Sequence, residues 1–133
     1  MRFTKQLWVE LAVELATFSL LVASITMLWR SNILLLAIVL AECLFALALW
    51  HERHDVSFFL ILAVFGTLAE VVFTSSGVWQ YNNPTWLGIP LWFPLAFGTA
   101  GVAGQRMART ATEVLGTRES PPDLDVSQPT TRS

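Results

Sequence analysis

Residues 77–94 read GVWQYNNPTWLGIPLWFP, an uncharged segment rich in aromatic residues and proline that joins two long apolar stretches. Asparagine, proline and glycine favour turns, whereas tryptophan and tyrosine favour the boundary between lipid and water. The segment therefore predicts a turn at a membrane surface, with a membrane-crossing helix on either side of it. No other stretch of the sequence carries a comparable signature of a site.

The composition of the whole chain supports a membrane protein. Of its 133 residues, 54% are apolar and only 14% are charged. The charges cluster near the N-terminus, around residues 51–55 and after Gln105, and apolar stretches of about 20 residues separate the clusters. At about 1.5 Å per residue, such a stretch crosses a hydrocarbon core about 30 Å thick. The single cysteine, Cys43, excludes a disulfide framework, and nothing in the composition points to a nucleic acid partner.

Tryptophans mark the ends of the first two spans. Trp8, Trp29 and Trp50 recur at an equal spacing that corresponds to about 31 Å of helix, the distance between the two interfacial belts of a bilayer. We predict an all-α fold, a polytopic four-helix transmembrane bundle over residues 1–106 and a polar cytoplasmic tail over 107–133. The four predicted spans cover residues 7–29, 31–50, 55–78 and 86–106.

Capping residues and prolines refine these boundaries. Ser31 or Asn32 is expected to cap the second helix, and Asp55 is expected to cap the third. Pro94 cannot donate a backbone hydrogen bond to the carbonyl of Pro90, so a kink or a broken first turn is expected in the last helix.

The basic residues predict the orientation of the bundle. Only Arg30 falls at the end that carries the turn over residues 79–85. Lysine and arginine accumulate on the cytoplasmic side of membrane proteins, so both termini are expected in the cytoplasm and the turn outside, in a prokaryotic plasma membrane. The cytoplasmic end then holds Arg2, Lys5, Arg53, Arg106, Arg109 and Arg118.

Carboxylates lie within the apolar spans. Glu10 and Glu14 share one face of the first span near the cytoplasmic boundary, where Lys5 is a candidate partner. Glu42 and Glu70 lie deeper, about 14–17 Å from the outer edge, at matching depth on antiparallel neighbours. A carboxylate at such a depth costs about 2.5–3.5 kcal/mol on insertion scales, so both residues call for an explanation.

Two interpretations of Glu42 and Glu70 are open. In one, the two carboxyl groups turn toward each other around a polar or lipid-headgroup cavity and share a proton. In the other, each is protonated and hydrogen-bonded to a neighbouring helix, and only holds the bundle together. Thr67 and Thr74 share a helix face with Glu70 and would offer hydroxyl contacts to a ligand.

Small residues on the last two spans predict that these helices approach each other closely. The small residues are Ala63, Gly66 and Gly77 on the third span and Ala96, Ala100 and Gly104 on the fourth, flanked by Gly98, Gly101 and Ala103.

His51 and His54 have no evident third ligand at their level, so no metal site is expected, and no motif for a cofactor is present.

The turn and the helix after it carry a family resemblance, over Gly77–Arg106. The residues that carry it are Gly77, Val78, Trp79, Gln80, Tyr81, Pro84, Leu87, Trp92, Pro94 and Phe97, followed by the glycine-rich helix. This stretch resembles the last hairpin and final span of the Insig family, membrane proteins that regulate sterol synthesis in animals and have bacterial relatives. The resemblance implies a non-enzymatic helical bundle that holds a sterol, diacylglycerol or similar lipid. Members of that family are usually described with six spans, whereas this chain has room for four.

A weaker likeness points to carotenoid-pathway membrane proteins of the lycopene cyclase type, which carry a similar Gly-x-Trp-x-Tyr turn. Those cyclases continue with an acidic Pro-x-Glu-Glu motif, where this chain has Pro94-Leu-Ala. That difference argues against a cyclase, although Glu42 or Glu70 could act as an acid on a polyene.

The sequence therefore favours a non-enzymatic membrane protein that binds an apolar lipid, a partner membrane protein or a further copy of itself. The alternatives are an enzyme acting on a carotenoid or prenyl lipid through an intramembrane glutamate, and a purely structural membrane subunit. The candidate ligand-binding residues are Glu42, Glu70, Thr67, Thr74, Trp79, Tyr81, Trp86 and Trp92, with the aromatic residues at the outer mouth of the site.

Overall fold

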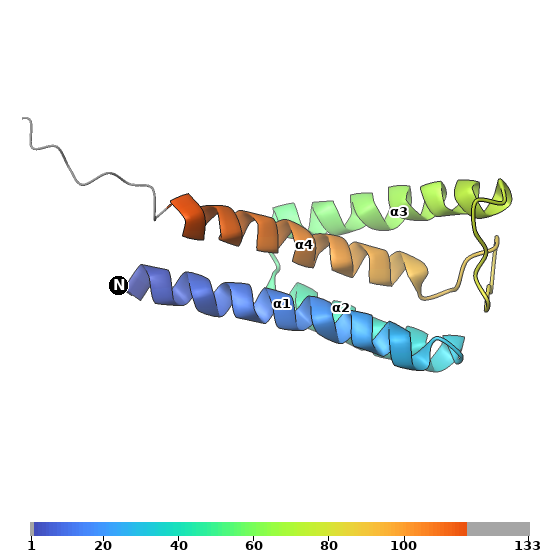
Figure 1. Ribbon diagram of the computed structural model, residues 1–133, viewed down its shortest axis with the longest axis horizontal. Helices are drawn as coiled ribbons and strands as arrows, with labels where there is room; N and C mark the ends of the chain where they lie inside the picture. The colour runs from blue at the N-terminus through green and yellow to red at the C-terminus, as the bar shows by residue number, and fades with distance from the viewer. Residues whose placement is uncertain (1, 117–133) are drawn as a thin grey trace, which may run out of the picture.

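The computed structural model describes residues 2–116, which form an all-helical bundle without a strand. The helices run side by side, with the α1–α2 turn and the long α3–α4 segment at one end of the bundle (Figure 1). The N-terminal end of α1 and the C-terminal end of α4 lie at the other end (Figure 1). The helices are α1 (Arg2–Leu28), α2 (Asn32–Leu49), α3 (Arg53–Ser75) and α4 (Phe93–Gly116).

Helix α4 is the centre of the bundle. It packs against α3, α1 and α2, and α1 also packs against α2. Two apolar clusters form the core, one near the α3–α4 segment around Leu35, Val39 and Trp92, the other nearer the opposite end around Phe59 and Val102. Many of the buried residues come from α4, whereas the outer faces of α1, α2 and α3 are apolar and exposed.

Glycines bring α3 and α4 into close contact, as the small residues of the sequence predict. The ring of Phe97 on α4 covers Gly66 of α3. Conversely, side chains of α3 cover glycines of α4: Phe59 covers Gly98, and Leu62 covers Gly101. A methyl group at any of these glycines would meet the covering side chain, so each large residue needs the glycine beneath it.

Three helices are long and apolar enough to cross a membrane, over Thr4–Leu28, Asn32–Leu49 and Arg53–Ser75. The predicted fourth span over residues 86–106 is not among them. Its helix begins only at Phe93 and continues to Gly116, so residues 107–116 of the predicted tail are helical. Its apolar part, residues 93–104, rises only about 18 Å before Arg106 follows. The predicted tail over residues 117–133 lies outside the described residues.

Several predicted helix boundaries also change. Ser31 occupies the N-cap of α2 without a side-chain cap hydrogen bond, and Asn32 is the first residue of the helix. Glu52, not Asp55, occupies the N-cap of α3, which places Asp55 within the first turn. Pro94 is the second residue of α4, where a helix needs no backbone donor, so it starts the helix instead of kinking it.

Substitution Gly98→Ala is expected to destabilise the bundle by about 1–3 kcal/mol, because the added Cβ would lie 2.6 Å from the ring of Phe59. Gly104→Ala is the matched control, since a Cβ there meets nothing within 4 Å and alanine favours a helix by about 1 kcal/mol over glycine. Unfolding of both variants in detergent, followed by circular dichroism, measures the difference. Equal stability of the two variants would show that α3 and α4 do not pack through this contact.

Candidate functional site

Glu70 anchors the aromatic turn to helix α3. Its side chain is buried, and its Oε1 atom accepts two hydrogen bonds, from Trp79 Nε1 at 2.7 Å and from the hydroxyl of Tyr81 at 2.5 Å. The indole of Trp79 also packs against the ring of Phe73, with 5.1 Å between centroids. Burial, together with the adjacent Glu70 carboxyl, raises the pKa of Tyr81 above its usual range, so its hydroxyl stays a donor at neutral pH.

Asn32 links helix α2 to the α3–α4 segment. Its Nδ2 atom donates to the carbonyl oxygen of Asn83 at 2.7 Å and to the hydroxyl of Thr85 at 2.8 Å. Its Oδ1 atom accepts from Trp92 Nε1 at 3.2 Å. One amide thus holds three points of the segment, a role that its prediction as a helix cap did not anticipate.

Asn83 makes the reciprocal connection to the α1–α2 turn. Its Nδ2 atom donates to the backbone carbonyls of Trp29, at 3.3 Å, and Arg30, at 3.1 Å. These carbonyls follow the last turn of α1, where helical partners are lacking. Asn32 and Asn83 together fasten the two connecting segments at this end of the bundle.

A pocket of about 250 Å³, whose wall combines amide side chains with apolar and aromatic ones, lies between these two segments. None of the described residues that line it carries a charge. The lining residues are Ile25, Trp29, Asn32, Gln80, Tyr81, Asn82, Asn83, Pro90 and Trp92, and we refer to this site as the polar pocket.

An apolar groove of about 170 Å³ adjoins the polar pocket and runs between α1 and α4. The two share Ile25 and Trp92, so the indole of Trp92 forms part of both walls. The groove is lined by Phe18, Leu21, Val22, Ile25, Trp92, Phe93, Ala96, Phe97 and Ala100, and we refer to it as the α1–α4 groove.

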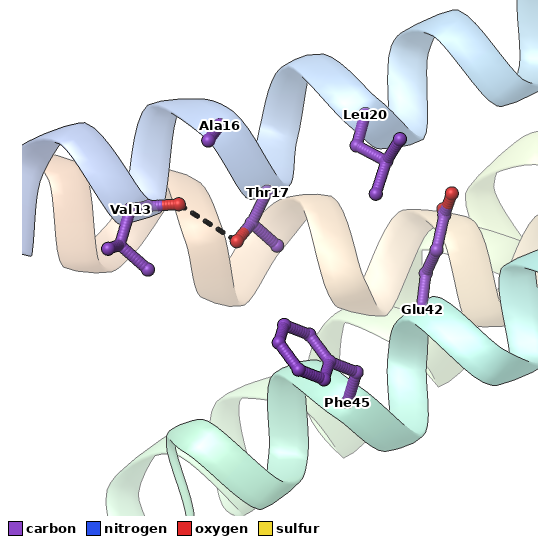
Figure 2. A pocket seen from close by; sticks show the side chains of 6 residues that line it. All are labelled: Val13, Ala16, Thr17, Leu20, Glu42 and Phe45. Carbon is purple, nitrogen blue, oxygen red and sulfur yellow. Dashed lines mark hydrogen bonds between the residues drawn. The ribbon is translucent and has the colours of Figure 1, made fainter.

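Glu42 belongs to a different place, a pocket of about 220 Å³ between α1 and α2. Its side chain rises from α2 toward α1 beside Leu20 (Figure 2). Ser24 of α1 donates a hydrogen bond to its Oε1 atom at 2.5 Å, while its Oε2 atom is buried and has no partner among the described residues. The rest of this Glu42 pocket is formed by Val13, Ala16, Thr17 and Phe45 (Figure 2).

The predicted site residues thus fall into separate groups. Glu42 and Glu70 have different partners, and no hydrogen bond within residues 2–116 joins them. Thr67 and Thr74 donate to carbonyls of their own helix, at 2.5 Å to Ala63 and 3.0 Å to Glu70.

The aromatic residues of the predicted mouth are also divided. Tyr81 and Trp92 line the polar pocket, whereas Trp86 lines a smaller hollow of about 70 Å³ with Thr67. Trp92 is buried and Trp86 is exposed. Tyr81 and Trp92 are therefore the predicted site residues that the polar pocket contains.

The opposite end of the bundle holds an ion pair that sequence reasoning missed. Asp55 is fully buried, and Arg106 donates to it from Nε at 3.0 Å and from Nη2 at 2.5 Å. The guanidinium also lies over the ring of Trp50, 5.3 Å from its centroid, and 3.4 Å from Glu52. The sequence could have predicted this pair, because the start of α3, which carries Asp55, and the part of α4 that carries Arg106 lie side by side if the two helices pack antiparallel.

The carboxylates of the first helix have partners other than Lys5. Glu10 accepts from Gln6 Nε2 at 3.3 Å, and buried Glu14 accepts from the hydroxyl of Thr110 at 3.0 Å. Glu14 therefore ties α1 to the part of α4 that had been assigned to the tail.

No family model, curated protein or solved structure matches the chain. We therefore infer function from the geometry of the described residues.

Substitution Asp55→Asn is expected to destabilise the bundle by about 3–5 kcal/mol, because it leaves the guanidinium of Arg106 without its buried counter-charge. Glu52→Gln is the control and should change stability by less than about 1 kcal/mol, since the Glu52 side chain is 61% exposed. Unfolding in detergent compares the two variants. A small effect of Asp55→Asn would mean that the pair does not hold α4 in place.

Proposed function

We propose that this is a non-enzymatic integral membrane protein that binds a lipid with an apolar body and a small polar end. The lipid body would lie in the α1–α4 groove and its polar end in the polar pocket. One observation carries the proposal: an apolar groove and an uncharged polar pocket meet at Ile25 and Trp92. The change of chemistry from the groove to the neighbouring pocket matches the change along an amphipathic lipid.

The walls of the groove support an elongated apolar occupant. Ala96 and Ala100 stand one helical turn apart on α4, and their small side chains leave room opposite the larger side chains of α1. Leu21 of α1 and Phe93 of α4 are buried and give the groove fixed walls. The lining is almost entirely apolar, so a polar molecule would gain no hydrogen bonds there.

The position of the polar pocket supports the same orientation. The pocket lies at the end of the bundle that carries Trp29, Trp79 and Trp86, residues typical of the interface between lipid and water. A lipid would therefore keep its polar end at the depth of the headgroups. The cytoplasmic location of the termini remains part of this proposal, on the strength of the basic residues at the opposite end.

Co-purification tests the proposal. Lipids extracted from the purified protein should include one species in stoichiometric amount, and native mass spectrometry should show the same mass bound. Ala100→Phe should remove that lipid, because the ring fills the groove. Ala48→Phe, at an exposed position of α2 outside the groove, should retain it. Absence of a defined lipid from the wild type, or its retention in Ala100→Phe, would contradict the proposal.

A second candidate function is an enzyme that isomerises a polyene or prenyl lipid. It is favoured by the unpartnered, buried Oε2 atom of Glu42 beside an apolar pocket. A protonated Glu42 would donate its proton to an alkene carbon and take a proton back from the resulting carbocation, so that no cofactor is needed. Glu70 is less suited, since Trp79 and Tyr81 already engage its carboxyl group.

Incubation of the purified protein with a linear carotenoid separates the two candidates. Under the enzyme hypothesis an isomeric product accumulates, Glu42→Gln abolishes it, and Glu70→Gln retains it. Under the binding hypothesis no product forms, and the bound lipid is recovered unchanged from the wild type and from Glu42→Gln. If both variants alter stability alone and no lipid is bound, the protein is a structural subunit.

A further inference from the structure

The polar pocket combines amide side chains with apolar and aromatic ones, which suits an uncharged group that carries hydroxyls. Gln80 and Asn82 present amides, each of which can both donate and accept a hydrogen bond. Sugar hydroxyls have the same dual character, and the C–H faces of a sugar ring are apolar enough to pack against aromatic rings. Trp29 and Trp92 supply such rings in the lining.

The same lining is unsuited to a phosphate. Phosphate recognition depends on arginine, lysine or several converging backbone N–H groups. Arg30, the nearest basic residue in sequence, is not among the lining residues, and its guanidinium lies over Trp29, 5.4 Å from the ring centroid.

The polar groups of the pocket divide into those used by the protein and those left for a ligand. Both donors of the Asn32 amide and the indole N–H of Trp92 are engaged within the fold. By contrast, the amides of Gln80 and Asn82 are exposed and have no partner among the described residues. The Tyr81 hydroxyl donates to Glu70 and keeps its lone pairs as acceptors. The engaged groups thus form a rigid frame, and the free groups line its opening.

The size of the pocket limits the ligand further. Its volume is about 250 Å³. That space accommodates a single sugar ring with its hydroxyls.

We propose that the polar pocket binds one neutral sugar residue carried on a lipid, joined directly and not through a phosphate. This inference rests on the proposed function, because the lipid part would occupy the α1–α4 groove. Gln80 and Asn82 hydrogen-bond the sugar hydroxyls, and the ring packs between the aromatic walls.

Competition binding in detergent tests the inference with four probes: monoglucosyl diacylglycerol, diacylglycerol with the same chains, phosphatidylglycerol and free glucose. The glycolipid should bind about tenfold or more tightly than any other probe. Gln80→Ala and Asn82→Ala should each reduce its affinity by about tenfold and leave the affinity for diacylglycerol unchanged. Ser75→Ala, at an exposed position outside the pocket, should change neither affinity.

Each contrary outcome has a distinct meaning. Equal affinity for the glycolipid and diacylglycerol overturns the sugar inference and leaves the proposed function intact. If phosphatidylglycerol binds more tightly than the glycolipid, the sugar inference is overturned in favour of a lipid with an anionic headgroup. If free glucose binds as tightly as the glycolipid, the inference that the sugar is carried on a lipid is overturned. Failure of all three lipids to bind overturns the inference and the proposed function together.

Discussion

The ion pair between Asp55 and Arg106 determines where helix α4 can lie. Two charges removed from water are tolerated only when each faces the other with good geometry, and Arg106 meets Asp55 through two nitrogen atoms. This requirement holds the later part of α4 against the start of α3. The contact between Gly98 and Phe59 then lies along the same interface, and the two helices pack closely from there toward the turn. The side of α4 that lines the groove is consequently turned toward α1.

The packing of α4 accounts for a fourth helix that is less apolar than the three candidate membrane spans. The outer helices present exposed leucine, valine and phenylalanine, as lipid-facing helices do. Helix α4 instead buries much of its surface against them, and its polar residues find partners there, as Thr110 does with Glu14. A helix that packs against three others therefore needs less hydrophobicity than one that packs against fewer.

The sequence predicted the first three helices well and the fourth poorly, for identifiable reasons. Long apolar stretches between tryptophans fix the length of a lipid-facing helix, and α2 ends within a few residues of its predicted limits. The position of α4 depends on tertiary contacts, so neither its start at Phe93 nor its continuation past Arg106 could be taken from hydropathy. Within the candidate site, Tyr81 and Trp92 were predicted from their chemistry, and both line the polar pocket. Asn32 was not, because its role depends on a segment about fifty residues away, through bonds to Asn83 and Thr85.

Glu42 and Glu70 have different partners, so the two carboxyl groups have separate roles in the bundle. Glu70 accepts hydrogen bonds from two side chains of the turn, and these bonds offset the free-energy cost of burying its carboxyl group. The same bonds fix Trp79 and Tyr81 in one place. That fixed turn forms one side of the polar pocket, which places Glu70 behind the site and not within it. Under the proposed function, selectivity for a lipid would also come from this end, because acyl chains of the bilayer are as apolar as the groove and gain little by entering it. Under the same proposal, a pocket held rigid before the lipid arrives would lose less entropy on binding, so the hydrogen bonds of its free amides would contribute to discrimination between headgroups.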